Sequence, residues 1–297
     1  MNKKTVLYIV EWGIAIAACG WLVWKMATYE DYAALGECLR SMGWSQWLAL
    51  AACVALMPVN MALEAWRWRT LMNGVQLSFR EAQRQVYYSK LAGLITPWRL
   101  GEYPARGLLM NGENGANGEN GGIWPKVLSM GAVGSATMTA AIVLAGIVGL
   151  MCSPSIFEWL GGSYLYSLLA AVVALGILFL LMPKALKRYA EVNQTLIWRS
   201  VGQSLVRLAC WCVQLALVIW ALGGLEILDI PEILGKSAIY YLLVTITPNV
   251  PIVEVGARGA WAMAVFGTMN AAFAGILLWV INTVFPCIIW LIMRKKR

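Results

Sequence analysis

Residues 87–107 read YYSKLAGLITPWRLGEYPARG, and residues 240–259 read YYLLVTITPNVPIVEVGARG. Both stretches contain Tyr-Tyr, then Ile-Thr-Pro, then Glu-x-x-Ala-Arg-Gly, in the same order. The proline and the glutamate are five residues apart in the first stretch and six residues apart in the second. Matches of this length in one order are improbable by chance, so they predict an internal repeat.

The chain around these two stretches has the composition of a membrane protein. Of its 297 residues, 60% are hydrophobic and 13% are charged, whereas soluble domains average about 25% charged residues. Apolar runs long enough to cross a bilayer occur at residues 5–27, 44–66, 127–150, 164–183, 201–222 and 271–293. We therefore expect residues 1–297 to form a single all-α polytopic membrane domain.

The first apolar run leaves one alternative open. It follows two lysines and contains Ile16-Ala17-Ala18-Cys19, a pattern that a cleaved signal or lipoprotein signal would also show. Because the run continues to Ala27 and includes Glu11, we favour an uncleaved first helix.

Two residue counts exclude whole classes of chemistry. The sequence contains no histidine, which excludes a histidine general base, a histidine-ligated metal and a Ser/His or Cys/His nucleophile pair. Its seven cysteines show no C-x-x-C and no metal-ligand spacing, and most lie in apolar runs. We expect them to be small buried hydrophobic residues, and we expect no metal and no cofactor.

Positive residues predict the orientation of the spans. If both termini are cytoplasmic, 15 of the 23 lysines and arginines fall on the cytoplasmic side, as the positive-inside rule requires. Tryptophans near the proposed span ends agree with an interfacial aromatic belt. The net charge of +8 is thus explained by topology, without a nucleic-acid partner. We expect an integral protein of the cytoplasmic (inner) membrane.

The repeat divides the chain into two halves, residues 1–151 and residues 152–297. Each half reads span, span, broken segment, span, and residues 111–122 form a flexible loop in the first half. If each broken segment is re-entrant, each half crosses the membrane an odd number of times, so the second half is inverted relative to the first. This predicts about six full spans plus two re-entrant segments. The alternative is eight full spans, two of them kinked at proline.

The helix breaks follow from local chemistry. Proline removes a backbone donor and disfavours helix in the residue before it, and irregular backbone survives at membrane depth only inside protein or beside a wet cavity. The residues expected at the two breaks are Thr96, Pro97, Gly101, Thr247, Pro248 and Pro251.

Charged side chains at membrane depth are candidates for function by default. The residues that we expect to form a binding site are Arg99, Glu102, Arg106, Arg207, Glu254 and Arg258. One interpretation is that symmetry-related arginines and two broken-helix ends bind an anion, since guanidinium offers a fork of donors that matches phosphate. The alternative is that the i,i+4 Glu/Arg pairs only neutralise each other at the start of a helix.

The sequence also resembles a known family. Residues 65–72 (AWRWRTLM) and residues 95–106 (ITPWRLGEYPAR) are similar to motifs of the lysylphosphatidylglycerol synthase transmembrane region, a flippase-like membrane family. The second stretch departs from the family's usual Pro/Gly-rich pattern, because residues 248–254 keep the prolines and the acid but lack the glycines.

The resemblance implies a protein that moves an anionic or aminoacylated phospholipid, or a related polyprenyl-phosphate lipid, between leaflets. Bifunctional members carry a cytosolic aminoacyltransferase domain, which does not follow here, so we expect no enzyme activity and a possible separate synthase or envelope-biogenesis enzyme as partner. Two alternatives are an integral-membrane lipid phosphatase or phosphotransferase, which would need a nucleophile near the arginines, and a structural membrane subunit that does not transport.

Overall fold

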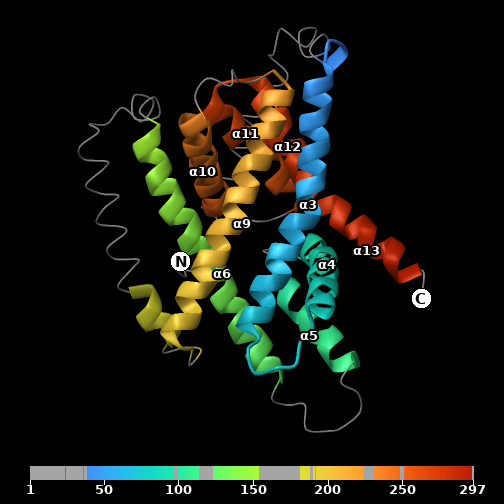
Figure 1. The fold of residues 1–297 in the computed structure, drawn as a ribbon, viewed down its shortest axis with the longest axis vertical. Coiled ribbons are helices and arrows are strands. Elements are labelled where there is room, and N and C mark those ends of the chain that lie inside the picture. The colour runs from blue at the N-terminus through green and yellow to red at the C-terminus, as the bar shows by residue number, and fades with distance from the viewer. Residues whose placement is uncertain are drawn as a thin grey trace, which may run out of the picture.

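The computed structural model describes residues 24, 36, 39–96, 99–113, 123–153, 181–187, 190, 192–223, 230–247 and 251–295. Every regular element in these ranges is a helix. The elements, labelled as in Figure 1, are α3 (Trp44–Leu71), α4 (Phe79–Ile95), α5 (Glu102–Glu113), α6 (Ile123–Cys152), α9 (Gln194–Ala221), α10 (Ile230–Ile246), α11 (Pro251–Phe266), α12 (Met269–Trp279), the π-helix η3 (Val280–Val284) and α13 (Phe285–Lys295).

Four stretches of helix are long and apolar enough to cross a membrane: α3, α6, α9 and the continuous run Met269–Met293. They overlap the spans predicted at 44–66, 127–150, 201–222 and 271–293, which confirms a membrane protein that is helical throughout its described elements. The predicted span 5–27 and most of 164–183, as well as residues 114–122 of the predicted loop, lie outside the described residues.

The helix α4 begins and ends at clear sequence signals. Its first turn is closed by a capping box, in which the Glu81 backbone N–H donates to Ser78 Oγ (3.2 Å) and the Ser78 N–H donates to Glu81 Oε2 (2.8 Å). The helix ends at Ile95 because Thr96, which precedes a proline, takes an extended conformation. The break therefore falls where the sequence predicts it.

The second break has the same cause. Helix α10 ends at Ile246, just before Thr247 and Pro248, and α11 starts at Pro251. Proline suits the first position of a helix because its missing N–H would have no partner there. Two short helices thus replace one long helix in each of the two predicted broken segments.

The two arms of each broken segment pack against each other, α4 against α5 and α10 against α11. In Figure 1, the α4–α5 pair lies towards one end of the long helices α3 and α9, and the α10–α11 pair lies towards the other end. Helix α4 also packs against α13, and α10 packs against α6.

For each broken segment, one hydrogen bond joins the chain just before the segment to the chain just after it. Lys126 Nζ, at the start of α6, donates to the carbonyl of Asn73, just after α3 (2.8 Å). Asn270 Nδ2, at the start of α12, donates to the carbonyl of Leu222, just after α9 (2.7 Å). Each broken segment therefore begins and ends near the same place.

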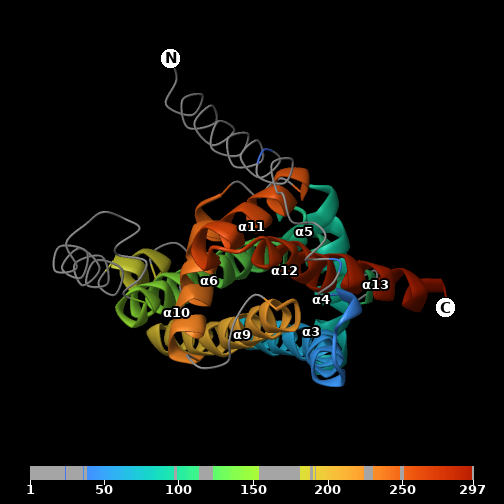
Figure 2. The same ribbon diagram turned by 90° about the horizontal axis from the view of Figure 1, so that it is seen from above.

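Helix α9 is central to the packing, because it contacts α3, α6, α10 and α12. Viewed from above, α3 and α9 lie side by side, with α6 and α12 in the next layer (Figure 2). Buried charged side chains of α3 and α9 face each other in this arrangement, and they form one side of the site described below.

Helices α6 and α10 approach closely at two glycines. A Cβ atom placed on Gly149 would lie 2.5 Å from the carbonyl oxygen of Gly235, which is backbone and cannot move aside cheaply. Small residues allow such close approach between helices in a membrane, where van der Waals packing contributes much of the association energy.

We expect Gly149→Ala to lower the thermal unfolding midpoint of the purified protein, with a destabilisation of about 1–3 kcal/mol from overpacking. The matched control is Gly202→Ala in α9, where no atom lies within 4 Å of the added Cβ. There the midpoint should stay the same or rise, because alanine is the better helix former. An unchanged midpoint in Gly149→Ala would contradict the α6–α10 packing described here.

Candidate functional site

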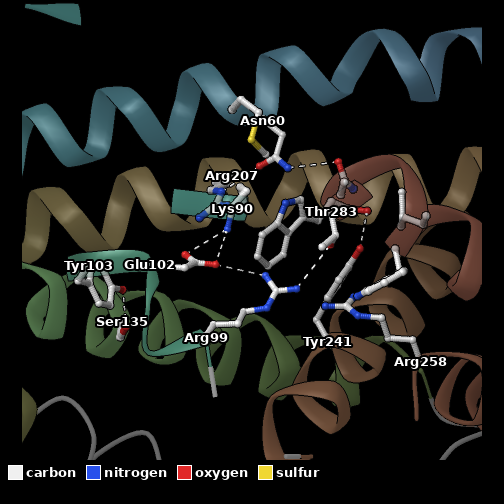
Figure 3. Close-up of a pocket in the computed structure, with 15 residues that line it drawn as sticks. Asn60, Lys90, Arg99, Glu102, Tyr103, Ser135, Arg207, Tyr241, Arg258 and Thr283 are labelled. Carbon is white, nitrogen blue, oxygen red and sulfur yellow. Dashed lines mark hydrogen bonds and ion pairs between the residues drawn. The ribbon is translucent and has the colours of Figure 1, made fainter. Parts of the chain in front are cut away.

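A cavity of about 220 Å³ lies among both broken segments and the helices α3, α6, α9, α12 and η3. Its walls combine charged and aromatic side chains, as Figure 3 shows. The polar and charged residues that line it are Asn60, Lys90, Arg99, Glu102, Tyr103, Ser135, Arg207, Tyr241, Arg258, Asn282 and Thr283. Four of the six residues expected at the site therefore face one cavity: Arg99, Glu102, Arg207 and Arg258.

Arg99 joins the two broken segments. Its Nη2 donates to both carboxylate oxygens of Glu254 in α11 (2.9 and 3.0 Å), and its Nη1 lies 3.5 Å from Glu102 Oε1 in α5. The backbone of Arg99 has φ of 53°, in the left-handed region that non-glycine residues rarely adopt. Such strain persists only where surrounding contacts hold it, and it is frequent at ligand sites.

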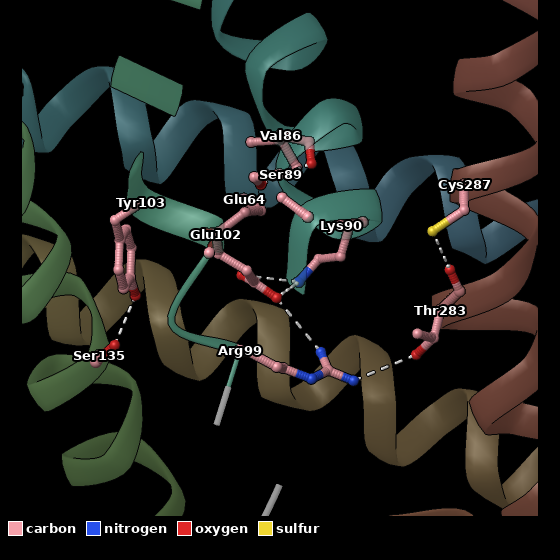
Figure 4. Close-up of polar contacts among 12 residues, drawn as sticks. Glu64, Val86, Ser89, Lys90, Arg99, Glu102, Tyr103, Ser135, Thr283 and Cys287 are labelled. Carbon is pink, nitrogen blue, oxygen red and sulfur yellow. Dashed lines mark hydrogen bonds and ion pairs between the residues drawn. The ribbon is translucent and has the colours of Figure 1, made fainter. Parts of the chain in front are cut away.

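Glu102 is paired with cations from its own broken segment. Lys90 Nζ donates to both of its oxygens (3.0 and 3.2 Å), across the gap between α4 and α5 (Figure 4). The i,i+4 neighbour Arg106 instead forms its ion pair with Glu64. The self-neutralising pair considered from the sequence is thus not the arrangement at this position.

The corresponding pair in the second segment is formed. Arg258 donates to Glu254 Oε1 from both Nε (3.0 Å) and Nη2 (2.8 Å), in the i,i+4 arrangement. Because Glu254 also accepts from Arg99, its single charge is shared between two guanidinium groups. Arg258 lines the cavity, and Glu254 is bonded to two arginines that line it, Arg99 and Arg258.

Arg106 lies away from the cavity wall and is 1% exposed. Its guanidinium lies over the ring of Trp68 (4.7 Å to the centroid) and near that of Tyr103 (5.4 Å). It donates to Glu64 Oε1 (2.8 Å) and to Ser89 Oγ (3.2 Å). These contacts indicate that Arg106 holds α5 against α3 and α4.

Glu64 in α3 accepts hydrogen bonds from three arginines. Its Oε2 accepts from Arg67 Nη2 and from Arg207 Nη1, both at 2.7 Å, and its Oε1 accepts from Arg106. Glu64 lies within the apolar run 44–66, and it is not among the residues expected at the site from the sequence. Its position in an apolar run was the available signal, and the three arginine partners could not be read from the sequence.

Positive charge exceeds negative charge in this network. Among the residues that the structure describes here, the cations are Arg67, Lys90, Arg99, Arg106, Arg207 and Arg258, and the carboxylates are Glu64, Glu102 and Glu254. Arginine stays protonated in proteins, so the surplus persists at neutral pH. This arrangement can bind an anion.

The sequence profile described as "Lysylphosphatidylglycerol synthase TM region" matches residues 10–290. The chain belongs to this family. The resemblance expected from residues 65–72 and 95–106 is therefore confirmed, over nearly the whole length of the chain. No curated protein matches the sequence.

In this member of the lysylphosphatidylglycerol synthase transmembrane-region family, polar side chains organise the first helix break. Thr96 Oγ1 donates to the carbonyl of Ala92 (2.8 Å) and accepts from the Gly101 N–H (3.0 Å). A Cβ on Gly101 would meet Thr96 Oγ1 at 2.8 Å and the Ala92 carbonyl oxygen at 2.9 Å, so the tight return of the chain requires glycine.

The second break is organised in the same way. Thr247 Oγ1 donates to the carbonyl of Leu243 (3.0 Å) and accepts from Trp261 Nε1 (2.8 Å). Pro251 is the first residue of α11. The other two prolines expected at the breaks, Pro97 and Pro248, lie outside the described residues.

A group of amide side chains beside the cavity was not expected from the sequence. Asn282 in η3 donates to Gln214 Oε1 in α9 (2.9 Å), and Asn60 Oδ1 in α3 accepts from Arg207 Nε (2.9 Å). The π-helix places Asn282 and Thr283 in the cavity wall, and such segments occur frequently at functional sites. Amides inside predicted spans were the signal for this group.

The described residues contain no group of three or more Cys, Asp or Glu side chains placed to hold a metal ion. Every carboxylate near the cavity is instead paired with lysine or arginine. The chemistry of the donor set is that of anion binding.

We expect Glu64→Gln to destabilise the fold by about 3–5 kcal/mol, because it leaves three buried guanidinium groups without their shared counter-charge. Chemical unfolding of the purified protein in detergent would measure this loss. Glu81→Gln is the matched control, since glutamine also completes a capping box and the residue lies at the start of α4. If both variants unfold at the same denaturant concentration, Glu64 does not hold the arginines in place.

Proposed function

We propose that the protein is a lipid transporter of the flippase type, which moves a lipid with an anionic headgroup between the two leaflets of the membrane. The observation that carries the proposal is the cavity between two broken helices, where Arg99 from the first and Arg258 from the second share the carboxylate of Glu254. A cationic cavity among membrane helices suits the part of a lipid that the bilayer core excludes. The lipid is moved unchanged, with no catalytic step, and a separate synthase would supply it.

A larger cavity supports a lipid as the ligand. It has a volume of about 600 Å³ and lies between α4 and α13, and the residues that line it include Arg80, Arg84, Tyr88 and Trp290. Basic and aromatic side chains in this combination are typical of the membrane interface. Helix α4 lines both cavities, with Lys90 in the smaller one. The larger cavity offers room for the apolar part of a lipid.

We further infer an inverted repeat, with residues 1–151 and residues 152–297 as its two units. The packing supports it, because exchanging α4 with α10 and α6 with α12–α13 turns the α4–α13 contact into the α10–α6 contact. The position of the two broken pairs towards opposite ends of α3 and α9 is also what a two-fold axis in the membrane plane would produce (Figure 1).

The two connecting hydrogen bonds favour re-entrant segments over full kinked spans. A full span would separate its two ends by the membrane thickness, about 30 Å. Lys126 contacts Asn73, and Asn270 contacts Leu222, so in each case the chain returns to where it started. Together with the distribution of basic residues, this supports a protein of the inner membrane with both termini in the cytoplasm.

Labelling of single cysteines in a cysteine-free variant tests this topology. Asn73→Cys and Pro125→Cys flank the first broken segment, and both should react with an impermeant maleimide only from the cytoplasmic side. Ser41→Cys, at the start of α3, should react only from the outside. A reaction of Asn73→Cys and Pro125→Cys from opposite sides would instead establish a full span.

Transport itself is measured with labelled anionic lipids in liposomes that contain the purified protein. We expect Arg99→Gln and Arg258→Gln to slow translocation about tenfold or more. Each variant loses guanidinium hydrogen bonds to the charged lipid headgroup, and such bonds are worth about 1.5–3 kcal/mol. The controls are Arg69→Gln and Arg199→Gln, whose side chains are exposed, and they should transport at the parent rate.

Equal rates for Arg258→Gln and the controls would mean that the cavity is not the transport site. The same liposomes should be assayed for release of inorganic phosphate from a polyprenyl pyrophosphate. Phosphate release would identify a phosphatase and would overturn the proposal that the lipid is moved unchanged.

A further inference from the structure

We propose that the cavity selects a phosphomonoester headgroup, which carries two negative charges, over a phosphodiester or an aminoacylated headgroup. This inference rests on the proposed function, since it names the chemical class of the lipid that the same cavity binds. It narrows the substrate to lipids that end in a simple phosphate.

The first argument is the surplus of positive charge around the cavity, which the protein's own carboxylates do not balance. In the described part of the chain, the network of Glu64, Glu102 and Glu254 holds three negative charges against six positive ones. Four of the six cations line the cavity: Lys90, Arg99, Arg207 and Arg258. Unpaired charges are costly inside a membrane protein, so the ligand that balances this surplus best is the one with the most negative charge.

The second argument is that the carboxylates beside the cavity are already paired. Both oxygens of Glu102 accept from Lys90, and both oxygens of Glu254 accept from Arg99. An aminoacylated lipid would bring an ammonium group that needs such an acceptor. The ring of Trp211, which could hold an ammonium group by a cation–π contact, already lies under the guanidinium of Arg207 (4.7 Å).

The third argument is size. Cavities that bind whole small molecules measure about 300–1,000 Å³, whereas this one measures about 220 Å³. It is suited to a compact group such as a terminal phosphate. A phosphate esterified on two sides, or one extended by an amino acid, has more atoms to bury in the same space.

The three headgroups differ in charge in a way that can be measured. A phosphomonoester has a second pKa near 6, so it carries between about one and two negative charges across the neutral range. A phosphodiester keeps one negative charge over the same range. If the dianion is the bound form, affinity for the monoester rises about tenfold from pH 5 to pH 7, as the dianion grows from about one tenth to about nine tenths of the ligand.

The pH dependence of binding can come from the ligand or from ionisable groups of the protein. The sequence has no histidine, and the ordinary pKa values of carboxyl, phenol, amine and guanidinium groups lie outside pH 5–7. The ionisable groups that line the cavity are Lys90, Arg99, Glu102, Tyr103, Arg207, Tyr241 and Arg258, and Glu64 and Glu254 form ion pairs with arginines that line it. A change in affinity between pH 5 and pH 7 that occurs for the monoester, but not for the phosphodiester, therefore reports the ligand.

The experiment measures binding of three short-chain probes to the full-length purified protein in one detergent. The probes are dioctanoyl phosphatidic acid, dioctanoyl phosphatidylglycerol and its lysyl ester, each titrated at pH 5, 6 and 7. We expect the phosphatidic acid to bind at least about tenfold more tightly than the other two at pH 7 and to lose about tenfold in affinity at pH 5. The affinity for phosphatidylglycerol should stay constant.

Two further variants assign the selectivity to the cavity. Arg258→Gln should reduce the preference for phosphatidic acid, whereas Arg199→Gln, on the exposed surface, should leave it unchanged. Because the comparison is made first among ligands on the parent protein, it does not depend on whether a variant folds.

The outcomes separate this inference from the proposed function. Equal affinity and equal transport for the monoester and the diester would overturn the phosphomonoester inference and leave a lipid transporter. Tighter binding of the lysyl ester would also overturn it. If none of the lipids is translocated in liposomes, the proposed function itself fails.

Discussion

The rest of the structure depends on the ion pairs that the buried carboxylate of Glu64 forms with three arginines. It lies in α3 and holds Arg106 of α5, Arg207 of α9 and its own neighbour Arg67 at hydrogen-bond distance. Arginine stays charged, so burying any of these three in an apolar interior without a counter-ion would be strongly destabilising. One buried acid thus determines how three helices meet, and it explains why the first broken segment is fixed against the α3–α9 pair.

The arginines have different roles in this arrangement. Arg67 and Arg106 do not line the cavity. Their hydrogen bonds to the Gly134 carbonyl and to Glu64 hold helices together. Arg99 and Arg258 differ, because they share the single charge of Glu254 and face open space. The two motifs that look alike in sequence therefore place different members at the cavity: Glu102 in the first motif, where Arg106 serves packing, and Arg258 in the second.

This difference shows how far the sequence could predict the molecule. Long apolar runs specify α3, α6, α9 and the last span, and the Ile-Thr-Pro strings specify both helix breaks, because these features depend on local composition and on the chemistry of proline. Partner choice is not local. The pairing of Lys90 with Glu102, and of Arg106 with Glu64, depends on how helices distant in sequence approach each other, and the spacing Glu102–Arg106 alone favoured a pair that does not form.

The π-helix η3 illustrates a dependence of another kind. Pro286 cannot donate to the carbonyl of Asn282, so regular winding is interrupted there and α13 turns away from α12 (Figure 1). Each residue advances a helix by about 100°, so loss of a single residue from η3 would rotate all of α13 by that angle. Trp290, whose ring lies 5.2 Å from that of Tyr88, would then leave α4. The length of η3 therefore determines which face of α13 packs against the rest of the protein.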